Sequence, residues 1–93
     1  MNLHDYLSSP GALSVAKLRE RIGAASDAQI RQWQHKYVGR RPSFENCVAI
    51  ERATDGAVTV EELRPVGFWM RIADAEWPHT FGRPVLDFTK AEA

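Results

Sequence analysis

The chain has 93 residues, of which 44% are hydrophobic and 10% aromatic, and its 12 basic side chains balance 12 acidic ones. This length allows one compact domain and leaves little room for a large catalytic architecture, so we expect no enzyme and no cofactor. One cysteine excludes an intramolecular disulfide, and no apolar stretch approaches the roughly 20 residues that span a bilayer. The first residues lack the pattern of a signal peptide, so we expect a cytoplasmic protein.

Two short helices are expected at the start of the chain. Asn2 followed by Asp5 is typical of a capped helix, which we expect over residues 2–7. Ser9 before Pro10 places a capping residue ahead of a proline at the first helical position, which predicts a second helix running to about residue 22. Its buried stripe is expected at Val15, Leu18 and Ile22, and Gly23 is expected to close it.

The third helix has the best-defined start. Ser26 and Gln29 form a Ser-x-x-Gln capping box, in which side chains satisfy free backbone N–H groups at the helix start. We expect this helix to run from residue 27 to about 36 or 37 and the chain to turn at Gly39. The side chains expected to face inward are Ile30, Trp33 and Tyr37.

Two further helices are expected before residue 65. Ser43 can cap a helix that runs through Thr54 and stops at Asp55 and Gly56. A second capping box, over residues 59–62, predicts a fifth helix that Pro65 limits to little more than a turn. The core residues of the fourth helix are expected to be Phe44, Cys47 and Ile50, with Cys47 acting as a small buried hydrophobic residue.

We therefore expect an all-α domain of five short helices over residues 1–65, followed by a C-terminal extension over residues 66–93. The extension is too apolar for an ordinary disordered tail, because it holds five of the nine aromatic side chains. Residues 68–72 could form a turn of helix or a short strand, and residues 83–88 alternate like an edge strand. The aromatic side chains could enlarge the core or form a dimerisation or partner-binding arm.

The neutral total conceals an uneven distribution of charge. Residues 17–41 carry seven basic and two acidic side chains, a net charge of +5, whereas residues 42–93 carry five basic and nine acidic ones, a net charge of −4. The basic charge falls on the second and third helices and the loop after them. Two helices joined by a short glycine-containing turn, the second of them basic, are typical of a helix-turn-helix motif for the major groove of DNA.

The outward face of the third helix has the side chains that such a motif needs. When its apolar stripe faces inward, the outward residues are Ala28, Arg31, Gln32 and His35. Arginine can bind guanine through two hydrogen bonds, glutamine can bind adenine in the same way, and alanine can pack on a thymine methyl group. We expect these four residues to contact bases.

A second set of residues flanks this face. The residues expected to contact DNA phosphates are Ser26, Lys36, Arg40, Arg41 and Lys17. The alternative is an ordinary solvated helix face, on which His35 is a plain surface residue. The capped helix and the local charge of +5 favour DNA contact.

Several runs resemble one family. They are Arg31–Trp33, Gly39–Pro42, Cys47–Thr59 and Glu62–Pro65. These residues resemble the YdaS-type, Cro-like helix-turn-helix proteins of bacteria and their prophages, and the resemblance covers roughly residues 11–65. It implies a fold like that of phage Cro and repressor proteins, with residues 27–36 as the recognition helix. It also implies a role as a transcriptional regulator or a toxin-associated antitoxin. The segment from Trp33 to Gly39 departs from the family's usual pattern, because it is about one helical turn longer.

The sequence therefore predicts a sequence-specific DNA-binding regulator that occupies a double-stranded operator as a homodimer. The alternative is an antitoxin or adaptor whose extension, residues 66–93, binds a protein partner, and truncation after Pro65 would separate the two. No metal site is expected, because His4, His35 and His79 are scattered and have no carboxylate or cysteine at ligand spacing.

Overall fold

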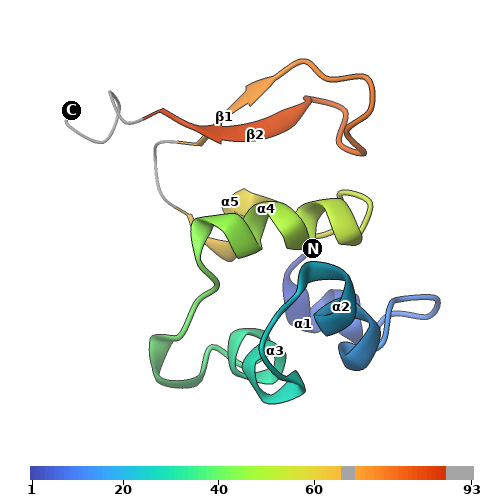
Figure 1. The fold of residues 1–93 in the computed structure, drawn as a ribbon, viewed down its shortest axis with the longest axis vertical. Helices are drawn as coiled ribbons and strands as arrows, with labels where there is room; N and C mark the ends of the chain where they lie inside the picture. The colour runs from blue at the N-terminus through green and yellow to red at the C-terminus, as the bar shows by residue number, and fades with distance from the viewer. Residues whose placement is uncertain (66–68, 88–93) are drawn as a thin grey trace.

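The structure is a computed structural model that describes residues 1–65 and 69–87. Five α-helices, one 3-10 turn and two strands follow one another in this part of the chain (Figure 1). They are α1 (Leu3–Leu7), α2 (Val15–Ile22), α3 (Asp27–Gln34), η1 (Tyr37–Gly39), α4 (Phe44–Ala53), α5 (Val60–Leu63), β1 (Trp69–Ile72) and β2 (Arg83–Leu86).

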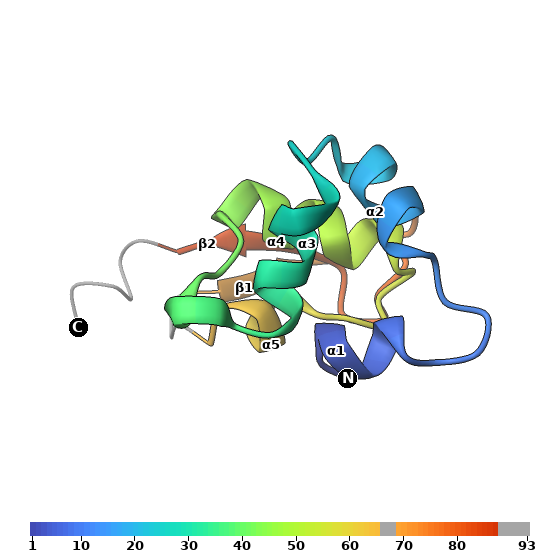
Figure 2. The ribbon, with the colours of Figure 1, turned by 90° about the horizontal axis from the view of Figure 1, so that it is seen from below.

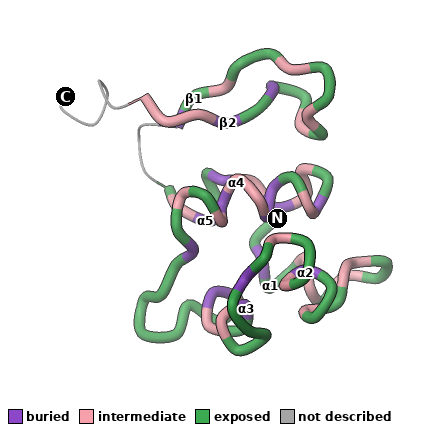
Figure 3. Tube along the Cα trace, viewed as in Figure 1, coloured by how far each residue is buried: buried purple, intermediate pink, exposed green. Residues whose placement is uncertain are grey.

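The elements are arranged in three levels. The β1–β2 hairpin lies at one end of the molecule, α4 and α5 lie in the middle, and α1, α2 and α3 lie at the other end (Figure 1). Every helix contributes to one core, and purple segments in Figure 3 mark its buried residues. The buried hydrophobic residues are Leu3, Leu18, Ala24, Ile30, Trp33, Cys47, Ile50, Val58, Val60, Leu63 and Trp69.

The first helix follows the sequence prediction, but the second begins later than predicted. The side chain of Asn2 caps α1 by accepting a hydrogen bond from the backbone N–H of Asp5 (2.8 Å). The cap of α2 is Ser14, not Ser9, and its Oγ accepts from the backbone N–H of Lys17 (3.1 Å). The prediction from Ser9 was wrong because Gly11 has a φ of +79°, which ends any helical path through this turn.

The third helix begins as predicted and ends early. The backbone N–H of Gln29 donates to Oγ of Ser26 (3.2 Å), which confirms the cap. The helix ends at Gln34 because Lys36 adopts a left-handed backbone conformation with a φ of +53°. Tyr37 therefore does not continue the inward stripe and is 63% exposed, which corrects its predicted place in the core.

The fourth helix confirms its predicted cap and its core positions Cys47 and Ile50, while Phe44 is half-buried at the edge of the core. The backbone N–H of Asn46 donates to Oγ of Ser43 (3.2 Å), and Cys47 and Ile50 are fully buried. Burial raises the pKa of the Cys47 thiol to about 11, so this cysteine is a thiol and not a nucleophilic thiolate at neutral pH.

The fifth helix has the predicted position without the predicted capping box. The side chain of Thr59 makes no capping hydrogen bond to α5. The backbone N–H of Val60 instead donates to Oε1 of Glu51 (3.1 Å), a residue of α4. A tertiary contact has therefore replaced a local one at the start of this helix.

A β-hairpin corrects the all-α prediction. Strands β1 and β2 pair antiparallel, with Trp69 opposite Leu86 and Ile72 opposite Arg83. Of the two alternatives for residues 68–72, the short strand is confirmed over Trp69–Ile72. The edge strand predicted for residues 83–88 is confirmed over Arg83–Leu86. Phe68 and Phe88 lie outside the described residues. The fold is mainly helical with a small two-stranded sheet.

Aromatic packing holds β1 against the helices. The Trp69 ring meets the Phe44 ring edge-on, with centroids 5.6 Å apart, and its Nε1–H donates to the carbonyl of Arg64 (3.0 Å). The Arg64 guanidinium lies 4.7 Å from the centroid of the Phe44 ring. Trp69 therefore belongs to the core, as one of the two alternatives for the aromatic residues predicted.

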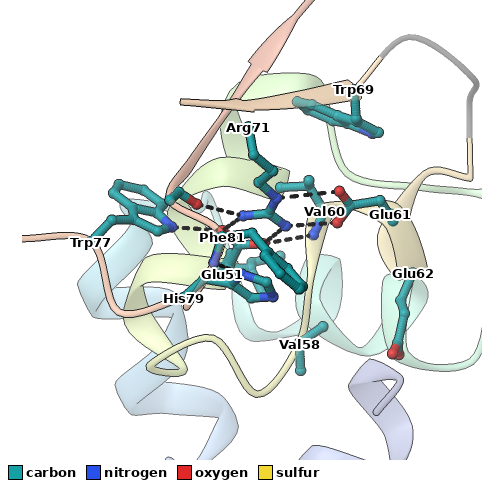
Figure 4. A network of polar contacts seen from close by, with 12 residues as sticks. Glu51, Val58, Val60, Glu61, Glu62, Trp69, Arg71, Trp77, His79 and Phe81 are labelled. Carbon is teal, nitrogen blue, oxygen red and sulfur yellow. Dashed lines mark hydrogen bonds and ion pairs between the residues drawn. The ribbon is translucent and has the colours of Figure 1, made fainter. Parts of the chain in front are cut away.

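A buried polar cluster joins the hairpin to α4 (Figure 4). The Glu51 carboxylate is fully buried and accepts hydrogen bonds from Arg71 of β1 and from Nε1–H of Trp77 (2.6 Å). Burial alone would raise the pKa of Glu51, but these donors and the N–H of Val60 lower it below its ordinary value. The sequence did carry a signal for this cluster, because Glu51 lies within the buried stripe formed by Cys47, Ile50 and Thr54.

Candidate DNA interface

The turn between α2 and α3 sets the angle of the candidate recognition helix. Gly23 ends α2 with a φ of +71°, and the backbone N–H of the buried Ala24 donates to the carbonyl of Arg19 (3.1 Å). Nε of Arg19 also lies 3.0 Å from Oδ1 of Asp27, at the start of α3. Arg19 of α2 thus contacts both the turn and the first residue of α3.

The inner side of α3 fixes which side chains face outward. Ile30 is fully buried and Trp33 is 8% exposed, so both anchor the helix in the core. The four residues predicted to contact bases lie together along a shallow open hollow on the outer side. They are Ala28, Arg31, Gln32 and His35, and Tyr37 joins them in lining this hollow. Ala28, Arg31 and His35 are exposed and Gln32 is half-buried.

The end of α3 rests on α1. His35 is the C-cap of α3, and its ring centroid lies 5.6 Å from that of His4. Nδ1 of His4 lies 3.2 Å from Nε2 of Gln34, so α1 contacts two successive residues at this end of the helix. The first helix therefore packs against the C-terminal end of α3, and Figure 2 shows the two helices side by side.

The residues predicted to contact phosphates fall in three places. Lys36, Arg40 and Arg41 line a second, smaller cavity at the C-terminal end of α3, while Ser26 caps the opposite end. Lys17 lies on α2 with Nζ 3.9 Å from a Glu20 carboxylate oxygen. Within residues 1–65 and 69–87, no ion pair occupies the side chains of Arg31, Lys36, Arg40 and Arg41.

The model of the family described as bacterial toxin YdaS matches residues 14–72. The chain belongs to the YdaS family. The match begins at the cap of α2 and ends with β1, so it includes the whole of α3 and the Glu51–Arg71 pair. No curated protein and no solved structure matches the chain. The family resemblance inferred from the sequence is confirmed.

Sequence reasoning missed two residues, Tyr37 of the outer hollow and Arg71 of the buried cluster. Tyr37 lines the outer hollow although its spacing predicted a core position, because spacing alone does not reveal where a helix stops. Arg71 of this YdaS-family chain pairs with a residue of α4, and no local pattern announces a partner so far away in sequence. In the described part of the chain, no helix is long and apolar enough to cross a membrane.

Proposed function

We propose that this YdaS-family protein is a sequence-specific DNA-binding transcriptional regulator of the Cro-like type. The observation that carries the proposal is the outward face of α3, where four side chains suited to reading base edges lie along one hollow. Lys36, Arg40 and Arg41 follow the C-terminal end of α3, and among the described residues none of them forms an ion pair. The helix would enter the major groove of a double-stranded operator.

Each of the four side chains would recognise a different chemical group on the bases. Arg31 would donate two hydrogen bonds to guanine, and Gln32 would exchange two with adenine. Ala28, in the first turn of α3, would pack on a thymine methyl group, and His35 would contact a base at the other end of the helix. Each good two-bond contact discriminates between bases by about 1–3 kcal/mol.

Contacts with the sugar-phosphate backbone of DNA would position the helix without distinguishing one base sequence from another. Lys36, Arg40 and Arg41 would meet phosphates at the C-terminal end of α3, and Ser26 and Lys17 would do so at its N-terminal side. Because the whole chain carries no net charge, we expect its binding to random DNA to be weak. Specific contacts would then provide most of the preference for an operator.

We further propose that the protein binds its operator as a homodimer. Helix-turn-helix proteins commonly pair so that two recognition helices enter successive major grooves about 34 Å apart. A dimer would read a palindromic site and would double the number of base contacts available to this small chain.

Repeated selection from random duplex DNA with the full-length protein at moderate salt tests this function. Enrichment of a palindromic motif would support both specific binding and two-fold symmetry. A matched selection with a variant that carries Arg31→Ala and Gln32→Ala should enrich no such motif. If the unaltered protein also enriches none, the proposed function is wrong.

One observation favours the second candidate, an antitoxin or adaptor. An apolar hollow lies between α4 and the hairpin, lined by side chains that include Val48, Val85 and Leu86. Truncation after Pro65 would not test this candidate cleanly, because it removes Arg71 and leaves the buried Glu51 carboxylate without its cation. Val85→Lys in the full chain alters the hollow and spares α3.

The two candidates predict opposite results in a reporter controlled by the selected operator. If DNA binding carries the function, Arg31→Ala should relieve regulation and Val85→Lys should preserve it. Relief by Val85→Lys, with operator binding intact, would favour the protein-partner function instead.

A further inference from the structure

Tyr37 occupies an unusual place for a large aromatic residue. Its side chain is 63% exposed, lines the outer hollow beside Ala28, Arg31, Gln32 and His35, and makes no hydrogen bond within the described residues. It lies three residues beyond the end of α3. An exposed ring on the reading face is therefore available to the same partner as the recognition helix.

The backbone of the loop holds Tyr37 in this position. The loop after α3 has positive φ values at Lys36 (+53°), Val38 (+52°) and Gly39 (+68°). A positive φ is uncommon for any residue with a side chain and is a true outlier for a branched one such as valine. Two tight hydrogen bonds close the loop, from the N–H of Gly39 to the carbonyl of Lys36 (3.0 Å) and from the N–H of Arg40 to the carbonyl of Tyr37 (2.9 Å).

The surroundings of Tyr37 favour a polyanionic partner. Residues 28–44 contain four arginine and lysine side chains and no acidic one. The hollow itself is lined mostly by apolar surface. A partner that matches both the basic charge and the apolar hollow presents an apolar group flanked by negative charges. DNA has this arrangement where a thymine methyl group projects into the major groove between the two phosphate backbones.

We infer that Tyr37 is a specificity-determining residue, which contacts the methyl group of a T·A base pair at the edge of the half-site nearest the C-terminal end of α3. This inference rests on the proposed function. The ring would extend the reading surface beyond the last turn of the helix, next to His35. The thymine contact of Ala28 would lie at the other end of α3, so the two contacts fall on different base pairs.

Replacement of single thymines by deoxyuridine in the selected duplex tests this contact, because it removes the methyl group and nothing else. For the unaltered protein, the replacement at the Tyr37 position should weaken binding about fourfold, the change expected for one buried methyl-sized group. For Tyr37→Ala, the same replacement should change affinity little. Tyr37→Phe keeps the ring and should keep the sensitivity.

Two controls separate this contact from general effects. Phe81→Ala removes another exposed aromatic side chain, 73% exposed, from the loop between β1 and β2, and should leave the deoxyuridine profile unchanged. The thymine position assigned to Ala28 should remain sensitive in Tyr37→Ala, which shows that the variant is folded and bound in register.

Each outcome decides a separate question. If the unaltered protein selects a motif and Tyr37→Ala keeps the same deoxyuridine profile, the role of Tyr37 is wrong and the proposed function stands. If the unaltered protein binds all duplexes alike, the proposed function fails and the inference fails with it. Loss of sensitivity at a single thymine, restored by phenylalanine, supports the inference.

Discussion

Arg71 of β1 and Glu51 of α4 form a two-pronged ion pair, with Nη1–Oε2 and Nη2–Oε1 distances of 2.6 Å (Figure 4). The glutamate side chain is fully buried and that of Arg71 is 13% exposed. Nη2 of Arg71 also lies 2.7 Å from Oε1 of Glu61, and its Nη1 donates to the carbonyl of Gly82 (3.0 Å). One arginine of β1 therefore contacts α4, α5 and the residue just before β2.

Loss of the arginine should destabilise the fold strongly. Arg71→Met leaves the Glu51 carboxylate buried without its cation, which costs about 3–5 kcal/mol in comparable buried pairs. The free energy of unfolding from urea denaturation measures the loss. The control is Arg83→Met, because Arg83 pairs with Asp74 at 3.6 Å on the surface and such pairs contribute only about 0–1 kcal/mol.

A double variant shows whether the cost comes from the unpaired charge. Glu51→Leu combined with Arg71→Met removes both charges, and should recover much of the stability that Arg71→Met alone loses. A double variant as unstable as the sum of its two single variants would contradict this explanation.

Acid should weaken the same contact. The pKa of Glu51 in the folded protein lies below its ordinary value of 4.5, so the stability that this carboxylate contributes is complete above that pH. That stability is lost as the pH falls through the lower pKa of the folded state. Urea denaturation between pH 7 and pH 3 should show a decline below about pH 4.5. In Glu51→Gln the decline should be shallower, and an identical decline would assign the effect to other carboxylates.

Gly82 should tolerate no side chain. A Cβ at this position would lie 2.0 Å from the carbonyl oxygen of Ile72, and the φ of +94° is itself unfavourable for other residues. Gly11→Ala is the matched control, because Gly11 also has a positive φ (+79°) but no atom within 4 Å of its Cβ position. Both variants should lose about 1–2 kcal/mol from the backbone conformation. Gly82→Ala should lose clearly more in thermal unfolding, and equal losses would contradict the close approach.

Arg31 and Arg40 should differ in their effects on DNA binding. Arg31→Ala should relax discrimination at one base pair, because a two-bond contact to guanine is lost. Arg40→Ala should weaken binding to all duplexes alike and reduce the salt dependence by about one ion. Affinities for the selected duplex and its point variants at several salt concentrations measure both effects.

Arg83→Ala removes a charge at the hairpin end of the molecule, remote from α3, and should change neither property (Figure 1). An equal loss on every duplex from Arg31→Ala would contradict the proposed register of α3.

The amino-acid sequence by itself determined the helical elements, the caps at Asn2, Ser26 and Ser43, the end of α2 at Gly23 and the membership of the family. These features depend on hydrogen bonds and apolar spacing within one or two helical turns, so they can be read locally. The outward set on α3 follows from the same spacing, since burial of Ile30 and Trp33 leaves the opposite side exposed. Its contact with DNA and the division of the chain at residue 65 stay predictions.

Only the tertiary structure decided where Tyr37 lies, how α5 begins and how β1 and β2 pack against the helices. The positive φ of Lys36 turns the chain away from the helical path just before Tyr37, and no residue pattern encodes that turn. Glu51 is buried because Arg71, twenty residues later, supplies its cation. Such features depend on contacts between segments far apart in sequence. These contacts stabilise the chain only after folding has brought the segments together.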